Sequence, residues 1–162
     1  MMQAIEVLEN PGSTTKLFKA LTDDYVLEVL DSGVYAGIFQ RITLIKLDQI
    51  PVMLGLSATC TTNQLFMDIL QNAATTPIGS KLFAPDSKIL RGEMIIKKIA
   101  VKEIVNPIIF KYIRTMNIDD KLYYRYSIFK SGQETMELNE YVLPGLDVIL
   151  NKYKEEHLCN AF

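Results

Sequence analysis

Residues 122–143 read LYYRYSIFK, then SG, then QETMELNEYVL, and this stretch decides the fold. Both runs are long and contain many of the aromatic and branched residues that strands favour. The Ser131-Gly132 step between them has the composition of a tight turn. The stretch therefore predicts a hairpin of two antiparallel strands.

The second run carries a carboxylate on its apolar face. Side chains alternate across a strand, so Glu140 shares a face with Met136, Leu138 and Val142. A buried carboxylate costs free energy unless a partner satisfies it. Glu140 is therefore expected either to be paired structurally or to face a cavity, where it could act as a general acid or base.

Arg125 is the candidate partner of Glu140. Around a two-residue turn at Ser131-Gly132, Leu138 opposes Arg125, which places Arg125 diagonal to Glu140 on the same face. Two roles follow from this position. Arg125 either steadies a buried acid through a salt bridge or supplies a cation for a carboxylate ligand.

The rest of the chain predicts an α+β domain with an antiparallel β-sheet. Residues 1–162 contain no repeat and no linker, so a single domain is expected. Further strands are predicted at about residues 25–30, 38–47, 51–59 and 89–104, and helices at about 13–21, 65–70, 77–83 and after residue 145.

Bulk properties exclude several functional classes. The chain has 162 residues, 49% hydrophobic and 22% charged, with a net charge of -2, which indicates a folded protein and no nucleic-acid partner. No apolar stretch approaches the roughly 20 residues that span a bilayer, and residues 1–10 have no signal-peptide pattern. A cytoplasmic protein without a membrane partner is expected.

Two cysteines and one histidine cannot form a conventional zinc site, so we expect no metal.

Two further elements are candidate anion-binding sites. Thr76-Pro77-Ile78-Gly79 has a cap residue, a proline suited to the first helical position and a glycine that lets a ligand approach the backbone. The free amides of Ile78 and Gly79 would bind a small anion. Arg41 lies in an apolar strand-like run whose alternation does not decide which way its side chain points; solvent exposure is expected by default, and bidentate binding of a carboxylate is the alternative.

The chain resembles the chorismate pyruvate-lyase family in four segments. Residues 76–83, TPIGSKLF, are similar to a family segment T-P-L-G-x-x-L-F, and residues 139–144, NEYVLP, resemble T-E-L-F-L-P. Residues 12–18, GSTTKLF, are similar to D-S-M-T-K-x-F. The strand that begins at Arg41 and the turn at residues 48–51 match the family's arginine strand and hairpin. Order and spacing agree across about residues 12–144.

The resemblance implies a fold, a reaction and a set of roles. The fold is an antiparallel sheet with helices that enclose an internal ligand cavity. The reaction removes pyruvate from chorismate to leave 4-hydroxybenzoate, without a cofactor. Arg41 would hold the ring carboxylate with help from the backbone amides of Ile78 and Thr14. Glu140 would contact the hydroxyl end of the ring and serve as the catalytic residue.

The sequence departs from the family at two places. A second family arginine corresponds to Leu56, so either Arg125 or Arg91 substitutes for it, or the pyruvyl side is bound differently. The chain also continues 18 residues beyond Pro144. This extra helix is expected either to close the cavity or to form a contact in a homodimer.

The alternative function is a non-catalytic domain that binds a small aromatic acid as an effector. Sensor domains of some bacterial transcription regulators share the fold. Such domains usually follow a DNA-binding module, for which residues 1–162 leave no room, so the lyase is the expected function. A relative that acts on another aromatic or enolpyruvyl acid is a third hypothesis.

Overall fold

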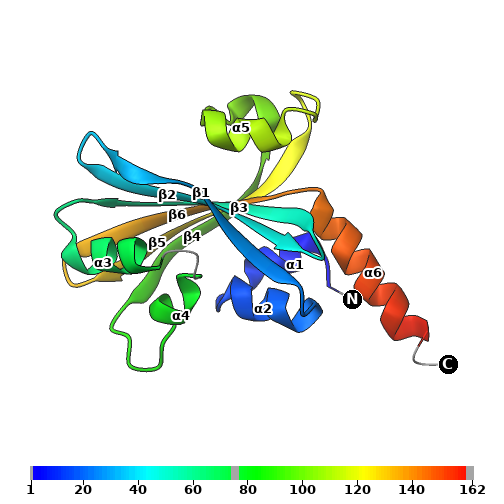
Figure 1. Ribbon diagram of the computed structural model, residues 1–162, viewed down its shortest axis with the longest axis horizontal. Coiled ribbons are helices and arrows are strands. Elements are labelled where there is room, and N and C mark those ends of the chain that lie inside the picture. The colour runs from blue at the N-terminus through cyan, green and yellow to red at the C-terminus, as the bar shows by residue number, and fades with distance from the viewer. Residues whose placement is uncertain (1, 74–76, 160–162) are drawn as a thin grey trace.

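The chain forms one six-stranded antiparallel sheet with the strand order β1-β2-β3-β6-β5-β4 (Figure 1). The computed structural model describes residues 2–73 and 77–159. The strands are β1 (Tyr25–Tyr35), β2 (Ile38–Leu47), β3 (Ile50–Cys60), β4 (Leu90–Ala100), β5 (Lys121–Ser131) and β6 (Glu134–Val142). The β5-β6 hairpin therefore pairs with β3, and it separates the three-strand unit β1-β2-β3 from β4.

Helices cover both faces of the sheet unequally. One face carries α5, and the opposite face carries the other helices (Figure 1). The helices are α1 (Ala4–Glu9), α2 (Thr14–Leu21), α3 (Gln64–Asn72), α4 (Gly79–Leu82), α5 (Pro107–Ile113) and α6 (Gly145–Cys159), with a short 3-10 turn at Val101–Glu103. This arrangement confirms the predicted α+β fold with an antiparallel sheet and flanking helices.

Two helices were not predicted, and one predicted strand is too long. α1 has six residues, and its sequence gave no prediction. α5 follows a cap, because the Asn106 side chain accepts hydrogen bonds from the amides of Ile108 and Ile109. The strand expected up to residue 104 ends at Ala100, whose amide donates to the Glu103 carboxylate at 2.6 Å and opens the 3-10 turn instead.

The predicted register of the β5-β6 hairpin is wrong, because the two turn residues lie one position later in the sequence than expected. Ser131 pairs with Glu134, so Gly132 and Gln133 form the turn. Gly132 has φ +60° and occupies the first central position, as in a type II′ turn. As a result Arg125 lies directly opposite Glu140 instead of diagonal to it. The shift keeps both side chains on the same face.

The core consists of three buried clusters. The first joins α1, α2 and α6 to the ends of β2 and β3, and the second lies under α5 on the other face. The third surrounds Phe66, Phe129 and Met136 beside α3. The first and third clusters occupy two ends of the same sheet face. Between them this face carries smaller and polar side chains.

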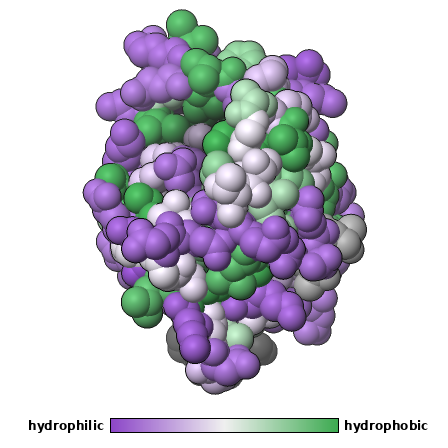
Figure 2. All heavy atoms as spheres, turned by 90° about the vertical axis from the view of Figure 1, so that its left-hand side faces the viewer, coloured by the Kyte–Doolittle hydropathy of each residue, from purple (hydrophilic) through white to green (hydrophobic). Residues whose placement is uncertain are grey.

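The surface is mixed in character. Seen from the side where the β1-β2 hairpin lies, hydrophobic residues reach the surface in patches between hydrophilic ones (Figure 2). Within residues 2–73 and 77–159, no helix has both the length and the apolar character that crossing a membrane requires.

The start of α6 depends on the absence of a side chain at Gly145. A Cβ there would lie 2.2 Å from the Pro51 carbonyl oxygen, which is backbone and cannot move aside. We expect Gly145→Ala to lower the free energy of unfolding by about 1–3 kcal/mol, as other overpacked sites do. Urea denaturation measures this, with Gly33→Ala as the matched control, since a Cβ at Gly33 meets only the Tyr35 side chain at 3.4 Å or more. Equal losses in the two variants would contradict the clash.

Candidate functional site

A cavity of about 70 Å³ lies between the sheet and the first turns of α2 and α4. This volume is several times what one buried water needs. Residues 12–15 and 77–79 form one wall, and side chains from all six strands form the other. The starts of the two helices thus cover one side of a partly open cavity on the sheet, where the resemblance implies an enclosed one.

Small side chains on the sheet create the space. Thr43, Gly55 and Ser57 lie at the centre of this face, where larger apolar side chains would otherwise fill the gap. Gly55 pairs with both Thr43 and Glu140, and a Cβ at Gly55 would lie only 3.0 Å from the Thr43 hydroxyl oxygen. The two helix starts also approach closely, because a Cβ at Gly79 would lie 2.8 Å from the Ser13 hydroxyl oxygen.

The lining of the cavity is rich in arginine. The chain has four arginines. Three of them, Arg41, Arg91 and Arg125, line this cavity, together with one acidic residue among the described lining, Glu140. Apolar side chains complete the wall; they are Leu27, Ile45, Met53, Pro77, Ile78, Leu82, Phe83 and Leu138.

Arg125 and Glu140 form a buried, bidentate ion pair. The Nε of Arg125 donates to Glu140 Oε2 at 2.6 Å, and Nη2 donates to Oε1 at 2.9 Å. The same guanidinium donates to the carbonyl oxygens of Leu8 and Asn10 and to the Thr14 hydroxyl. These contacts use all five N–H donors of an arginine. Arg125 is therefore fully occupied within the protein, and it neutralises Glu140.

Arg41 is buried, which corrects the expectation that it reaches solvent. Its exposed fraction is 2%, and it lines the cavity from β2. Alternation along the strand did not decide this position, because the helices that cover the face are remote in sequence. Burial lowers the pKa of Arg41, while the charge interaction with the Tyr25 hydroxyl opposes that shift. A carboxylate beside Arg41 would relieve the cost of burying its charge.

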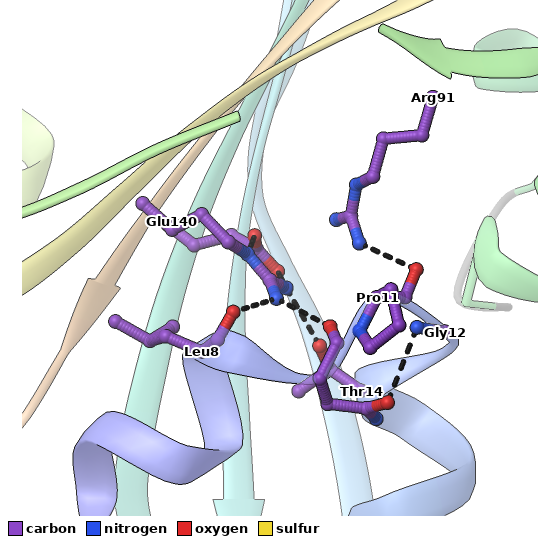
Figure 3. A network of polar contacts seen from close by, with 8 residues as sticks. Leu8, Pro11, Gly12, Thr14, Arg91 and Glu140 are labelled. Carbon is purple, nitrogen blue, oxygen red and sulfur yellow. Dashed lines mark hydrogen bonds and ion pairs between the residues drawn. The ribbon is translucent and has the colours of Figure 1, made fainter. Parts of the chain in front are cut away.

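Arg91 enters the cavity from the edge strand β4. Its Nη1 donates to the Pro11 carbonyl oxygen at 2.8 Å (Figure 3). Its guanidinium carbon lies 5.4 Å from the Phe83 ring centre and 5.1 Å from that of Phe129. Burial and, to a lesser extent, the charge of Arg125 lower the pKa of Arg91 to about 10, with Glu140 opposing the shift. The sequence named Arg91 only as a substitute for the second family arginine.

Of the other residues that the sequence singled out, some line the cavity and some do not. Thr14 and Ile78 both line the cavity; Thr14 accepts the hydrogen bond from Arg125, and Ile78 precedes α4. Thr76 lies outside the described residues. Leu56 packs in the cluster under α5, so its position faces away from the cavity and could not supply a charge there.

The C-terminal helix packs elsewhere. Leu146, Ile149 and Leu150 of α6 join the cluster with α1 and α2. No described residue of α6 is among those that line the cavity. Of the two roles expected for this helix, closing the cavity is therefore not observed, and a homodimer contact stays a prediction. The described part of the chain has no group of three or more His, Cys, Asp or Glu side chains placed to hold a metal ion.

Comparison with known proteins shows similarity in structure only. No family profile and no curated protein matches the chain. The C-terminal domain of the histidine utilization repressor from Pseudomonas syringae matches with a TM-score of 0.53 and 14% identity, over 74% of this chain and 92% of that one. A gene product of Staphylococcus aureus matches with a TM-score of 0.56 and 10% identity, over 83% and 90%.

A third similar structure is the possible transcriptional regulator YydK from Bacillus subtilis. It matches with a TM-score of 0.52 and 9% identity, over 74% of this chain and 57% of that one. These likenesses show a shared fold. The chorismate lyase-like fold that the sequence predicts is confirmed; of the three named structures, one is the C-terminal domain of a repressor and another is a possible transcriptional regulator.

Breaking the buried ion pair should lower the free energy of unfolding. Arg125→Met would leave the Glu140 charge buried without its partner, which costs about 3–5 kcal/mol in comparable pairs. We expect a loss of that size in the free energy of unfolding, measured by urea denaturation at neutral pH. The control Arg114→Met removes an exposed arginine and should change stability by less than about 0.5 kcal/mol.

The double variant Arg125→Met/Glu140→Met distinguishes the contribution of the ion pair to stability from that of the other Arg125 contacts. Because it removes both charges together, it should be more stable than Arg125→Met alone. A double variant less stable than the single one would show that Arg125 matters mainly through Leu8, Asn10 and Thr14.

Proposed function

We propose that this cavity binds a small organic anion and that the domain is a non-catalytic effector-binding domain of a regulator. The observation that carries the proposal is the charge of the lining. Glu140 is the one carboxylate among the described lining residues, and Arg125 already neutralises it. Among the described lining residues three arginines therefore outnumber one carboxylate, and an anion in the cavity would compensate the net positive charge.

The shape of the lining supports an acid with an apolar body. Leu27, Met53 and Leu138 offer apolar surface on the sheet, and Phe83 offers an aromatic ring on the other side. A few polar groups that fix orientation within a mostly apolar pocket are typical of small-molecule sites. A carboxylate held by Arg41 and by the amides near Ile78 and Thr14, with its ring against this apolar surface, fits the arrangement.

The structural neighbours support binding over catalysis. One is the C-terminal domain of a repressor and another is a possible transcriptional regulator. Regulation of this kind requires that a ligand bind and be released, with no bond broken. Three arginines and one internally paired carboxylate are sufficient for that task.

A lyase that converts chorismate to 4-hydroxybenzoate and pyruvate is the second candidate. The observation in its favour is that Arg41, Glu140, Thr14 and Ile78, all implied by the resemblance, line one cavity. In this reaction the enolpyruvyl group leaves and a ring proton is lost. The protein would orient the dianion and assist the proton transfer through Glu140.

The binding proposal can be tested with 4-hydroxybenzoate as the probe. We expect it to raise the melting temperature and to bind in calorimetry. Arg41→Met should weaken binding at least tenfold, because a charge-assisted contact of a carboxylate with arginine is lost. Arg114→Met removes the same charge at an exposed position and should bind as the wild type does. Equal weakening in both variants would point to a general charge effect, and absence of binding in the wild type would overturn the proposal.

Turnover separates the two candidates. The protein is mixed with chorismate alone, and 4-hydroxybenzoate is followed by chromatography. We expect no product above the uncatalysed rate. Product that forms at a catalytic rate and is strongly reduced by Glu140→Gln, with chorismate binding retained, would establish the lyase in place of the binding domain.

A further inference from the structure

β4 is an edge strand whose outer side pairs with no other strand of the described chain. It has 11 residues and stands last in the strand order, so β5 is its one neighbour in the sheet. An edge of this length presents a row of backbone N–H and C=O groups that a further strand can bind. It also carries two large apolar side chains that the fold leaves exposed, Leu90 at 72% and Ile95 at 42%. This edge is therefore suited to accept another strand.

The charges of β4 are arranged symmetrically about its midpoint. The strand runs from Leu90 to Ala100, so Ile95 is its middle residue. Glu93 lies two residues before Ile95, and Lys97 lies two residues after it. Side chains two positions apart share one face of a strand, and all three of these are exposed. One face of β4 therefore carries an acid, an apolar residue and a base at equal spacing.

This face of β4 lies on the side of the sheet away from the cavity. Lys97 pairs with Tyr124, which packs in the cluster under α5, and its ammonium lies 5.9 Å from the centre of that ring. Burial and neighbouring carboxylates, Glu93 among them, raise the pKa of Tyr126 to about 12, so Glu93 is close to this second tyrosine. Neither Glu93 nor Lys97 takes part in a salt bridge within residues 2–73 and 77–159. Both charges therefore remain available to a partner of opposite charge.

A two-fold axis through Ile95 and perpendicular to the sheet makes this pattern complementary to itself. If two β4 strands pair antiparallel about that axis, each residue lies opposite the one that is equally far from Ile95 on the other strand. Glu93 of each copy then lies opposite Lys97 of the other, and the two Ile95 side chains meet at the axis. On the other face, Met94 lies opposite Ile96. This register pairs the whole strand and creates two contacts between opposite charges.

Other registers of the same pairing lose the complementarity. An axis at Glu93 or at Lys97 brings two like charges together, which is destabilising. An axis at Met94 or at Ile96 places one of the charges opposite Ile95. Charged residues on an edge strand commonly prevent unspecific pairing, and here they also select one register.

We infer that β4 is the interface of a homodimer, in which the β4 strands of two copies pair antiparallel about Ile95 and join their sheets into one. The interface is isologous, so the assembly closes at two copies. The other edge strand, β1, has no such pattern, because its charged residues, Glu28 and Asp31, are both acidic. The inference goes beyond the proposed function, since Glu93, Ile95 and Lys97 do not line the cavity. It places the homodimer contact at β4 rather than at α6.

Charge reversals test this interface by sedimentation velocity on the full chain. We expect the wild type to sediment as a dimer, with twice the chain mass of 18.4 kDa. Glu93→Lys and Lys97→Glu each replace two attractive contacts by two repulsive ones, so each should weaken the dimer at least tenfold. Mixed in equal amounts, the two variants should form a heterodimer, because every contact between them joins opposite charges again. The control Val148→Lys changes an exposed apolar residue of α6 and should leave the dimer intact.

The opposite results would overturn the inference. A wild type that stays monomeric at every concentration measured needs no variant and is sufficient to reject it. A dimer that withstands both reversals, or two variants that stay monomeric when mixed, would also reject it, and matching melting temperatures would show that the variants are folded. Dissociation by Val148→Lys alone would place the interface on α6, and species larger than a dimer would indicate pairing of β4 with β1. None of these results depends on a ligand, so the proposed function is tested separately.

Discussion

The buried ion pair of Arg125 and Glu140 is the contact on which the rest of the structure depends. It joins β5 to β6 at the centre of the sheet, and the same guanidinium holds the carbonyl oxygens of Leu8 and Asn10. One side chain therefore anchors the end of α1 and the start of α2 to the sheet. The wall of the cavity at residues 12–15 follows directly from this anchored segment. A buried arginine requires such complete pairing, because each unmet donor is costly.

The pairing of Glu140 determines the charge of the cavity. Since Arg125 neutralises that carboxylate, the described lining residues together carry a net positive charge. Burial lowers the pKa of both side chains, which shows that the fold disfavours their charged forms. The protein tolerates this cost at a place where Gly55 and Ser57 also leave space. Small residues and a net positive lining at one position favour an anion as the ligand.

The sequence predicted the features that follow from local periodicity. Alternation placed Glu140 on the buried face correctly, because a period of two does not depend on tertiary contacts. The register was wrong because it depends on whether Gly132 takes the first or the second place in the turn. The burial of Arg41 depends on helices remote in sequence, and the bulge in β4 interrupts the alternation that would have revealed Arg91. α1 is short and is held by Arg125, 115 to 117 residues away, so local pattern could not predict it.

The geometry of Glu140 bears on the choice between binding and catalysis. A general acid or base must gain and lose a proton during the reaction. Both oxygens of Glu140 accept hydrogen bonds from Arg125, so a proton on this carboxylate would remove the counter-charge of a fully buried guanidinium. That loss is expensive in a low-dielectric site. A binding domain needs only fixed charges, and the pair contributes a fixed, neutral contact to the lining of the cavity. The residue that the sequence suggested for catalysis is thus held in the way that a structural residue is held, and this favours the effector-binding function.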